Sequence, residues 1–63
     1  MSLSHAGQAR NLATLMLEKH GVRAPAAALH EALKARGCGD DDRAETWTEA
    51  AKLAEDALRT GPT

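Results

Sequence analysis

Apolar residues recur at helical spacing in three segments of this 63-residue chain. The segments run from about residue 4 to 20, from 25 to 36 and from 41 to 59. Apolar positions three or four residues apart fall on one side of an α-helix. No segment has the alternation of β-branched and aromatic residues that is typical of a strand. The pattern therefore predicts an all-α fold.

Each predicted helix has boundary signals in the sequence. Ser4 is a candidate N-cap for the first helix, and Gly21 follows its last turn. Pro25 suits the first position of the second helix, and Gly37 is expected to end it. Gly61 and Pro62 end the third. Because the connections are short, consecutive helices should be antiparallel neighbours, and we expect a small three-helix bundle that forms one domain over residues 1–63.

The apolar stripes of these helices predict which residues form the core. They are Ala9, Leu12, Leu15 and Met16 in the first helix, Ala26, Leu29, Ala32 and Leu33 in the second, and Ala44, Trp47, Ala51, Ala54 and Leu58 in the third. Further stripes contain Leu17 in the first helix and Ala50, Leu53 and Ala57 in the third. Together these surfaces are wider than three small helices can bury. We therefore expect Ala50, Leu53, Ala57 and Leu17 to form a face for a partner or for self-association.

The composition strengthens the expectation of self-association. The chain has fourteen Ala but eight Leu, two Met, one Val and one Trp, and no Ile, Phe or Tyr. A core of this size rarely contributes more than about 3–5 kcal/mol, and small domains usually add a disulfide, a metal or a partner subunit. The single cysteine cannot form a disulfide within the chain. Oligomerisation is therefore the additional source of stability that we expect.

The sequence offers no sign of a membrane or secretory location. No apolar run approaches the ~20 residues of a membrane span, and no secretory signal is visible. One unpaired cysteine fits a reducing compartment. We expect a cytoplasmic protein that does not contact the membrane.

Charge is unevenly distributed along the chain. The net charge is −1, but residues 1–38 have a balance of +3 and residues 39–63 a balance of −4. Residues 8–36 could form a nucleic-acid-binding helix–turn–helix in which Arg23, Lys34 and Arg36 contact phosphates. A loose connection from residue 20 to 24, an alanine-rich second helix without Asn or Gln, and an acidic third helix argue against it. The basic first part can instead pair with the acidic last part, within one chain or between chains.

The segment GCGDDDRAETW, residues 37–47, is the strongest candidate for chemistry. Its contiguous aspartates do not alternate as calcium ligands do, and they suit the N-terminus of a helix. Asp42 with Glu45 fits a capping box, as does a cap one residue earlier. The possible metal ligands His5, His20, His30 and Cys38 show no ligand spacing. We expect no metal or other cofactor.

Enzymatic activity is not expected either. Cys38 near a helix N-terminus could have a lowered thiol pKa, but the adjacent carboxylates oppose this effect. No base is evident beside it. A bundle this small also leaves little room for an enclosed pocket.

A resemblance emerges from the spacing of His20-Gly21, Gly39-Asp40 and a tryptophan seven residues after that aspartate, followed by Ala51 and Leu58. The pattern resembles a family of very short bacterial proteins classed as a domain of unknown function, over about residues 9–59. Where that family often has a glycine shortly after Gly-Asp, this chain has Asp42, Arg43 and Ala44. The resemblance implies a stand-alone three-helix protein and no particular activity. It also implies that Trp47, Asp40, Gly21 and Gly39 are structural, with Asp40 capping the third helix and Trp47 fixing it to the others.

These observations favour a protein–protein interaction or regulatory module that self-associates. The alternative is the nucleic-acid-binding helix–turn–helix, with contacts from Arg23, Lys34 and Arg36. The two hypotheses differ in the surface that would bind the partner. The interaction module would use apolar helix faces, and the helix–turn–helix would use its cationic side chains.

Overall fold

The computed structural model describes residues 5–60, with side chains from residue 7 onward. It contains α1 (His5–His20), a 3₁₀ turn η1 (Gly21–Arg23), α2 (Ala24–Gly37) and α3 (Asp41–Thr60). No strand occurs in residues 5–60, so the all-α prediction is confirmed. Within the same range, no helix has the length and apolar character needed to cross a membrane. The predicted cap at residue 4 and the predicted stop at residues 61–62 lie outside the described residues.

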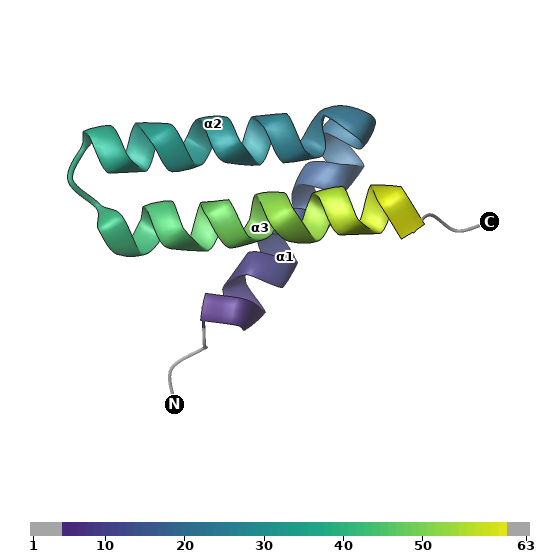
Figure 1. The fold of residues 1–63 in the computed structure, drawn as a ribbon, viewed down its shortest axis with the longest axis horizontal. Helices are drawn as coiled ribbons and strands as arrows, with labels where there is room; N and C mark the ends of the chain where they lie inside the picture. The colour runs from purple at the N-terminus through teal and green to yellow at the C-terminus, as the bar shows by residue number, and fades with distance from the viewer. Residues whose placement is uncertain (1–4, 61–63) are drawn as a thin grey trace.

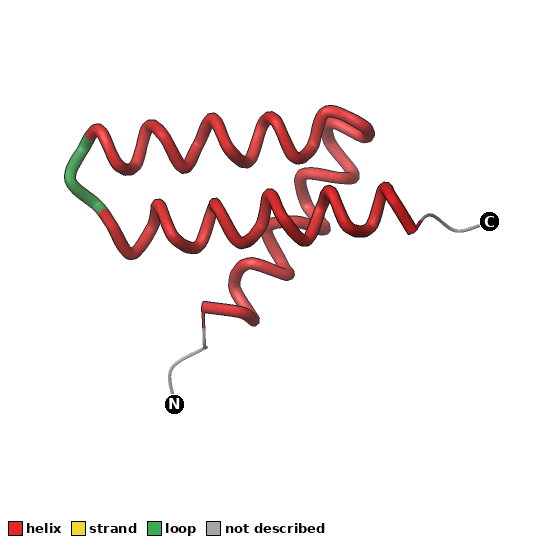
Figure 2. The backbone as a smooth tube through the Cα atoms, in the orientation of Figure 1, coloured by secondary structure: helices red, strands yellow, loops and turns green. Residues whose placement is uncertain are grey.

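The helices form a hairpin crossed by one further helix. α2 and α3 run antiparallel and side by side, while α1 passes behind α3 at a steep angle (Figure 1). α1 contacts both other helices, and the contact between α2 and α3 is the most extensive. Between residues 5 and 60, the one loop segment joins α2 to α3 (Figure 2). The α2–α3 hairpin is thus the central unit of the fold, and α1 packs against it.

The turn after α2 is fixed by its backbone. The N–H of Gly39 donates to the carbonyl of Arg36 at 3.0 Å, and the N–H of Asp40 donates to that of Ala35 at 2.9 Å. With Gly39 at φ +81°, this is the Schellman arrangement, in which glycine takes the left-handed position. Gly37 is the last helical residue of α2, so the helix ends at the predicted glycine. The left-handed glycine of the turn is Gly39, two residues later.

Asp40 is the N-cap residue of α3, which begins at Asp41. Its Oδ1 accepts a hydrogen bond from the N–H of Arg43 at 3.2 Å, which is the N-cap contact. The capping box was therefore predicted at the wrong position, because the helix begins at Asp41 and leaves Asp42 inside its first turn. Asp41 and Asp42 lie beside the positive end of the helix dipole. Each of the three aspartates thus has a structural role.

The connection between α1 and α2 is tighter than its sequence suggested. Gly21 has φ +59°, and the N–H of Ala24 donates to its carbonyl. A 3₁₀ turn therefore fills the segment that was predicted to be loose, and α2 begins at Ala24, one residue before Pro25. α1 leads into α2 without an irregular loop.

The core consists mainly of alanine. Of the twelve buried apolar residues in the described range, ten are Ala and the others are Met16 and Trp47. The buried hydroxyl of Thr46 donates to the carbonyl of Asp42 at 3.0 Å. This bond to the preceding turn satisfies the hydroxyl without a tertiary partner.

The inward face of α2 differs from the predicted one. The buried residues are Ala24, Ala28, Ala32 and Ala35, whereas Leu29 is 48% exposed and Leu33 60% exposed. Alanine allows the backbones of α2 and α3 to approach closely, and the bulkier leucines lie to one side of that contact. Of the predicted stripe on α2, only Ala32 is buried. In α1, Leu15 was also predicted inward and is 45% exposed.

Candidate functional site

The α2–α3 hairpin has two broad sides, and α1 covers one of them (Figure 1). The partly buried Ala27 of α2 and Leu53 of α3 pack against the core. No element of residues 5–60 covers the opposite side. We call that side the open face; it consists of Pro25, Ala26, Leu29 and Leu33 on α2 and of Thr48, Ala51, Lys52 and Glu55 on α3.

A shallow groove runs along the open face between the two helices. It has a volume of about 300 Å³ and is lined by all the residues of this face except Leu33. Leu33 lies one helical turn beyond Leu29 on the same side of α2. The two leucines therefore form a continuous apolar ridge beside the groove, with nothing in the described chain packed over it.

Charged residues follow the outer edge of the open face along α3. Asp41, Glu45 and Glu49 lie in its first half, and Lys52, Glu55, Asp56 and Arg59 in its second. The Arg59 guanidinium is 4.0 Å from the Glu55 carboxylate. The edge is therefore acidic near the hairpin turn and has no net charge toward the end of α3.

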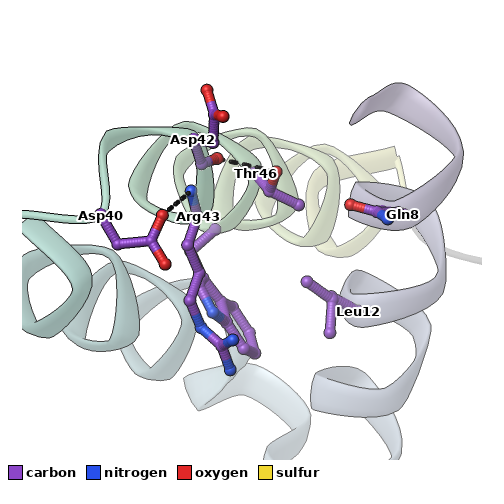
Figure 3. Close-up of a pocket in the computed structure, with 7 residues that line it drawn as sticks. Gln8, Leu12, Asp40, Asp42, Arg43 and Thr46 are labelled. Carbon is purple, nitrogen blue, oxygen red and sulfur yellow. Dashed lines mark hydrogen bonds between the residues drawn. The ribbon is translucent and has the colours of Figure 1, made fainter. Parts of the chain in front are cut away.

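A second cleft lies on the α1 side, near the hairpin turn (Figure 3). Its volume is about 350 Å³, and it is lined by Gln8, Leu12, Asp40, Asp42, Arg43, Thr46 and Trp47. Asp40 and Thr46 are already engaged in the hydrogen bonds that begin α3. In this cleft no thiol or hydroxyl lies beside a histidine base. The hydrogen bonds of Asp40 and Thr46 thus stabilise the start of α3.

The described residues also include no group of three or more His, Cys, Asp or Glu side chains that could hold a metal. Cys38 is exposed in the turn. The segment singled out in the sequence, residues 37–47, forms the turn from α2 to α3 and the first turns of α3.

The structure separates the four residues predicted to form an association face. Ala50 is fully buried within the chain, so its predicted contact with a partner was wrong. Leu53 and Leu17 are half-buried and pack against the core, whereas Ala57 is exposed. Both stripes of α3 are used inside the chain because α3 packs against α1 as well as α2. These four residues do not make one accessible surface.

The four residues expected to be structural occupy structural positions. Trp47 is 7% exposed and belongs to the core cluster. Gly21 and Gly39 have positive φ, and Asp40 caps α3.

The residues of the nucleic-acid alternative are not brought together. Arg23 precedes α2, whereas Lys34 and Arg36 lie in its last turn. At 1.5 Å per residue, Arg23 and Lys34 are about 16 Å apart along the axis. Lys34 also lies 3.8 Å from the Glu31 carboxylate. These cations do not form one patch.

Reasoning from the sequence missed the open face because it treated leucine as the inward residue of α2. The signal that could have revealed it is the spacing of Ala24, Ala28 and Ala32. Small residues at every fourth position mark a close helix contact, and they place Leu29 and Leu33 outside it.

Comparison of the chain with models of known protein families, with curated proteins and with solved structures finds no match. The resemblance to a family of short three-helix proteins stays a prediction.

Proposed function

We propose that this chain is a small protein–protein interaction or regulatory module that self-associates through the open face. The observation that supports it is the exposure of Leu29 (48%) and Leu33 (60%) beside a groove with no covering element in the described chain. The proposal includes a three-helix bundle in solution, a cytoplasmic location and no enzymatic activity.

The energetics of so small a core support self-association. Fully burying a leucine side chain contributes about 1.5–3 kcal/mol relative to leaving it exposed. The alanines of the core bury little area, and the two leucines are two of the five large apolar residues exposed in the described range. A second molecule bound to the folded state stabilises it by mass action.

The first test compares the wild-type chain with Leu33→Glu. Sedimentation should show that the mass of the wild type falls as the protein is diluted, with helicity followed by circular dichroism in the same samples. Leu33→Glu should be monomeric at concentrations where the wild type associates, because it places a charge in the apolar ridge.

Leu15→Glu is the matched control, because Leu15 is 45% exposed on the outer side of α1. It should associate as the wild type does. If the wild type is monomeric throughout, or if Leu33→Glu and Leu15→Glu associate equally, the proposed surface is wrong.

A further inference from the structure

We propose that the occupant of the open face is a second copy of this chain, related to the first by a two-fold axis that runs along the helices. In this dimer, α2 of each copy lies in the groove between α2 and α3 of the other. The inference rests on the proposed function, and it adds which helices meet and in which direction.

The open face is complementary to itself in shape. It has an apolar ridge, formed by Leu29 and Leu33, and beside the ridge a groove of about 300 Å³ between α2 and α3. A two-fold interface brings the same patch of both copies together, so residue i meets j and j meets i. An axis that places the ridge of one copy in the groove of the other therefore fills both grooves at once.

The direction of the axis decides whether this exchange is possible. An axis across the helices stacks α2 directly on α2 and α3 on α3, so each ridge meets a ridge. An axis parallel to the helices shifts the second copy sideways. Helix α2 of each copy then contacts α2 and α3 of the other, and the two α3 helices lie apart. Since α2 and α3 are antiparallel within one copy (Figure 1), they are also antiparallel between copies, as in an up-and-down four-helix bundle.

An axis parallel to the helices also keeps every residue at its level along the hairpin. Leu29 lines the groove with Thr48 and Lys52 of its own copy, so it comes level with the same two residues of the other copy. Each ridge leucine also comes level with the same leucine of the second α2. The leucines thus bury one another, while the long side chain of Lys52 extends past them to solvent.

The complete charge of the two helices favours this arrangement over the stacked one. Residues 23–37 contain three Lys or Arg and one Glu, a balance of +2, and α3 contains three Lys or Arg and six Asp or Glu, a balance of −3. The acidic residues of α3 are Asp41, Asp42, Glu45, Glu49, Glu55 and Asp56. The proposed axis sets α2 of one copy on α3 of the other, so unlike balances meet. The stacked packing sets α3 on α3, so two negative balances meet.

The far end of the hairpin shows the same complementarity locally. Pro25 and Glu55 line the groove together, so they are at one level. Arg23 lies two residues before Pro25, and Asp56 follows Glu55. The proposed axis therefore brings Arg23 of each copy level with Asp56 of the other.

The turn end of the hairpin adds a second region of unlike charge. Arg36 and Asp41 lie on either side of the turn, so each comes level with the other residue of the second copy. The axis also brings the two Arg36 side chains toward each other, with Asp41 of both copies at the same level. Glu45 already has an interaction within its own chain, and this arrangement does not require it to form another.

The size of the contact indicates a reversible dimer. The 14 residues of α2 are about 21 Å long, and this helix provides most of the surface that each copy inserts. Such a contact lies at the small end of specific interfaces, below roughly 1,200 Å² in total. In an interface of this size, electrostatic complementarity determines orientation more than affinity.

The first test measures the distance between the copies at Cys38, the only cysteine of the chain, which is exposed in the hairpin turn. Under the proposed axis the two turns lie at the same end of the dimer, with no separation along the helices. In a stacked packing with the axis level with residue 31, the two Cys38 residues lie about 21 Å apart along the helices. Double electron–electron resonance on the spin-labelled full chain should give the shorter distance. The signal should vanish when labelled chains are diluted with excess unlabelled protein.

The second test reverses the charge of one helix at a time. Arg23→Glu with Arg36→Glu changes the balance of residues 23–37 from +2 to −2, and Glu49→Lys with Asp56→Lys changes that of α3 from −3 to +1. Each double variant should dimerise about tenfold more weakly than the wild type, because like charges then meet between copies. An equimolar mixture should form heterodimers nearly as stable as the wild-type dimer, because both contacts between copies then join unlike charges. Sedimentation equilibrium with one variant fluorescently labelled measures both quantities.

The controls are double changes at exposed positions of α1, on the covered side of the hairpin. Arg10→Glu with Lys19→Glu makes the chain more acidic, and Asn11→Lys with Glu18→Lys makes it more basic. Both should dimerise as the wild type does, and their mixture should show no preference for the heterodimer. Circular dichroism confirms that all four double variants are helical.

The outcomes separate this inference from the proposed function. A long Cys38 distance overturns the axis proposed here, and so does an α3 reversal that strengthens the dimer. Salt should weaken the wild-type dimer, and strengthening by salt would likewise indicate that α3 meets α3. In each of these cases the open face stands if Leu33→Glu still prevents association. A wild type that never dimerises overturns both proposals.

Discussion

At the scale of single residues, two glycines close together in the sequence have opposite backbone requirements. Gly39 has φ +81° and completes the turn after α2, whereas Gly37 is helical. A Cβ added at either position would meet no atom within 4 Å. Any difference between substitutions at the two sites therefore comes from backbone conformation, since both have space for a side chain.

Gly39→Ala should lower the free energy of unfolding by about 1 kcal/mol, because an L-residue is strained at positive φ. Gly37→Ala should leave it unchanged or raise it by up to about 1 kcal/mol, because alanine has the higher helix propensity. Urea unfolding followed by circular dichroism, with both variants at one protein concentration, measures the difference. Equal effects of the two substitutions would show that the turn does not depend on the left-handed conformation of Gly39.

At the scale of the elements, the contact between α2 and α3 depends on small side chains. Ala24, Ala28 and Ala32 of α2 and Ala50 and Ala54 of α3 are all buried, and all but Ala32 have 0% exposure. This contact leaves no space for longer side chains. A larger residue in either stripe must therefore separate the helices.

Ala54→Leu should destabilise the fold by about 1–3 kcal/mol, the usual cost of overpacking a core. Ala57→Leu is the matched control, because Ala57 lies one turn later in α3 and is exposed. Thermal unfolding followed by circular dichroism measures the melting temperatures of both variants, and that of Ala54→Leu should be the lower. A melting temperature for Ala54→Leu as high as that for Ala57→Leu would mean that the contact between α2 and α3 is not close.

The elements also show what the sequence could predict and what it could not. The three helices and the glycine turns could be predicted because periodicity and turn chemistry are local properties. The buried side of α2 could not, because Ala28 and Leu29 compete for the core, and hydrophobicity alone favours leucine. The close approach of α3 reverses that preference. This approach depends on small residues of α3, such as Ala50 and Ala54, which lie far along the chain from Ala28. The open face therefore became visible only with the helices in place.

At the scale of the whole molecule, Trp47 is the largest side chain in the core cluster. Helices α1, α2 and α3 all contribute residues to that cluster, so removing the indole leaves a gap in the cluster that joins them. The alanines around it have no spare length with which to fill the gap.

Trp47→Ala should cost about 3–5 kcal/mol, as large-to-small core substitutions of aromatic residues do. Because a core of this size supplies about that much in total, the variant should be unfolded at 25 °C. Trp47→Phe, which keeps a ring in the core, should fold with reduced stability. Far-ultraviolet circular dichroism distinguishes these states, and a helical, cooperatively melting Trp47→Ala would contradict the role of the indole in that cluster.

The alanine core also has a calorimetric consequence. The heat-capacity increment of unfolding grows with the apolar area exposed and averages about 12–15 cal/mol/K per residue, or about 0.8 kcal/mol/K for 63 residues. The described residues bury ten alanines, one methionine and one tryptophan, so unfolding exposes less apolar area than it does in a leucine-rich domain of the same length. Its increment should fall below that average, so its stability curve is flatter and its cold denaturation lies further below freezing.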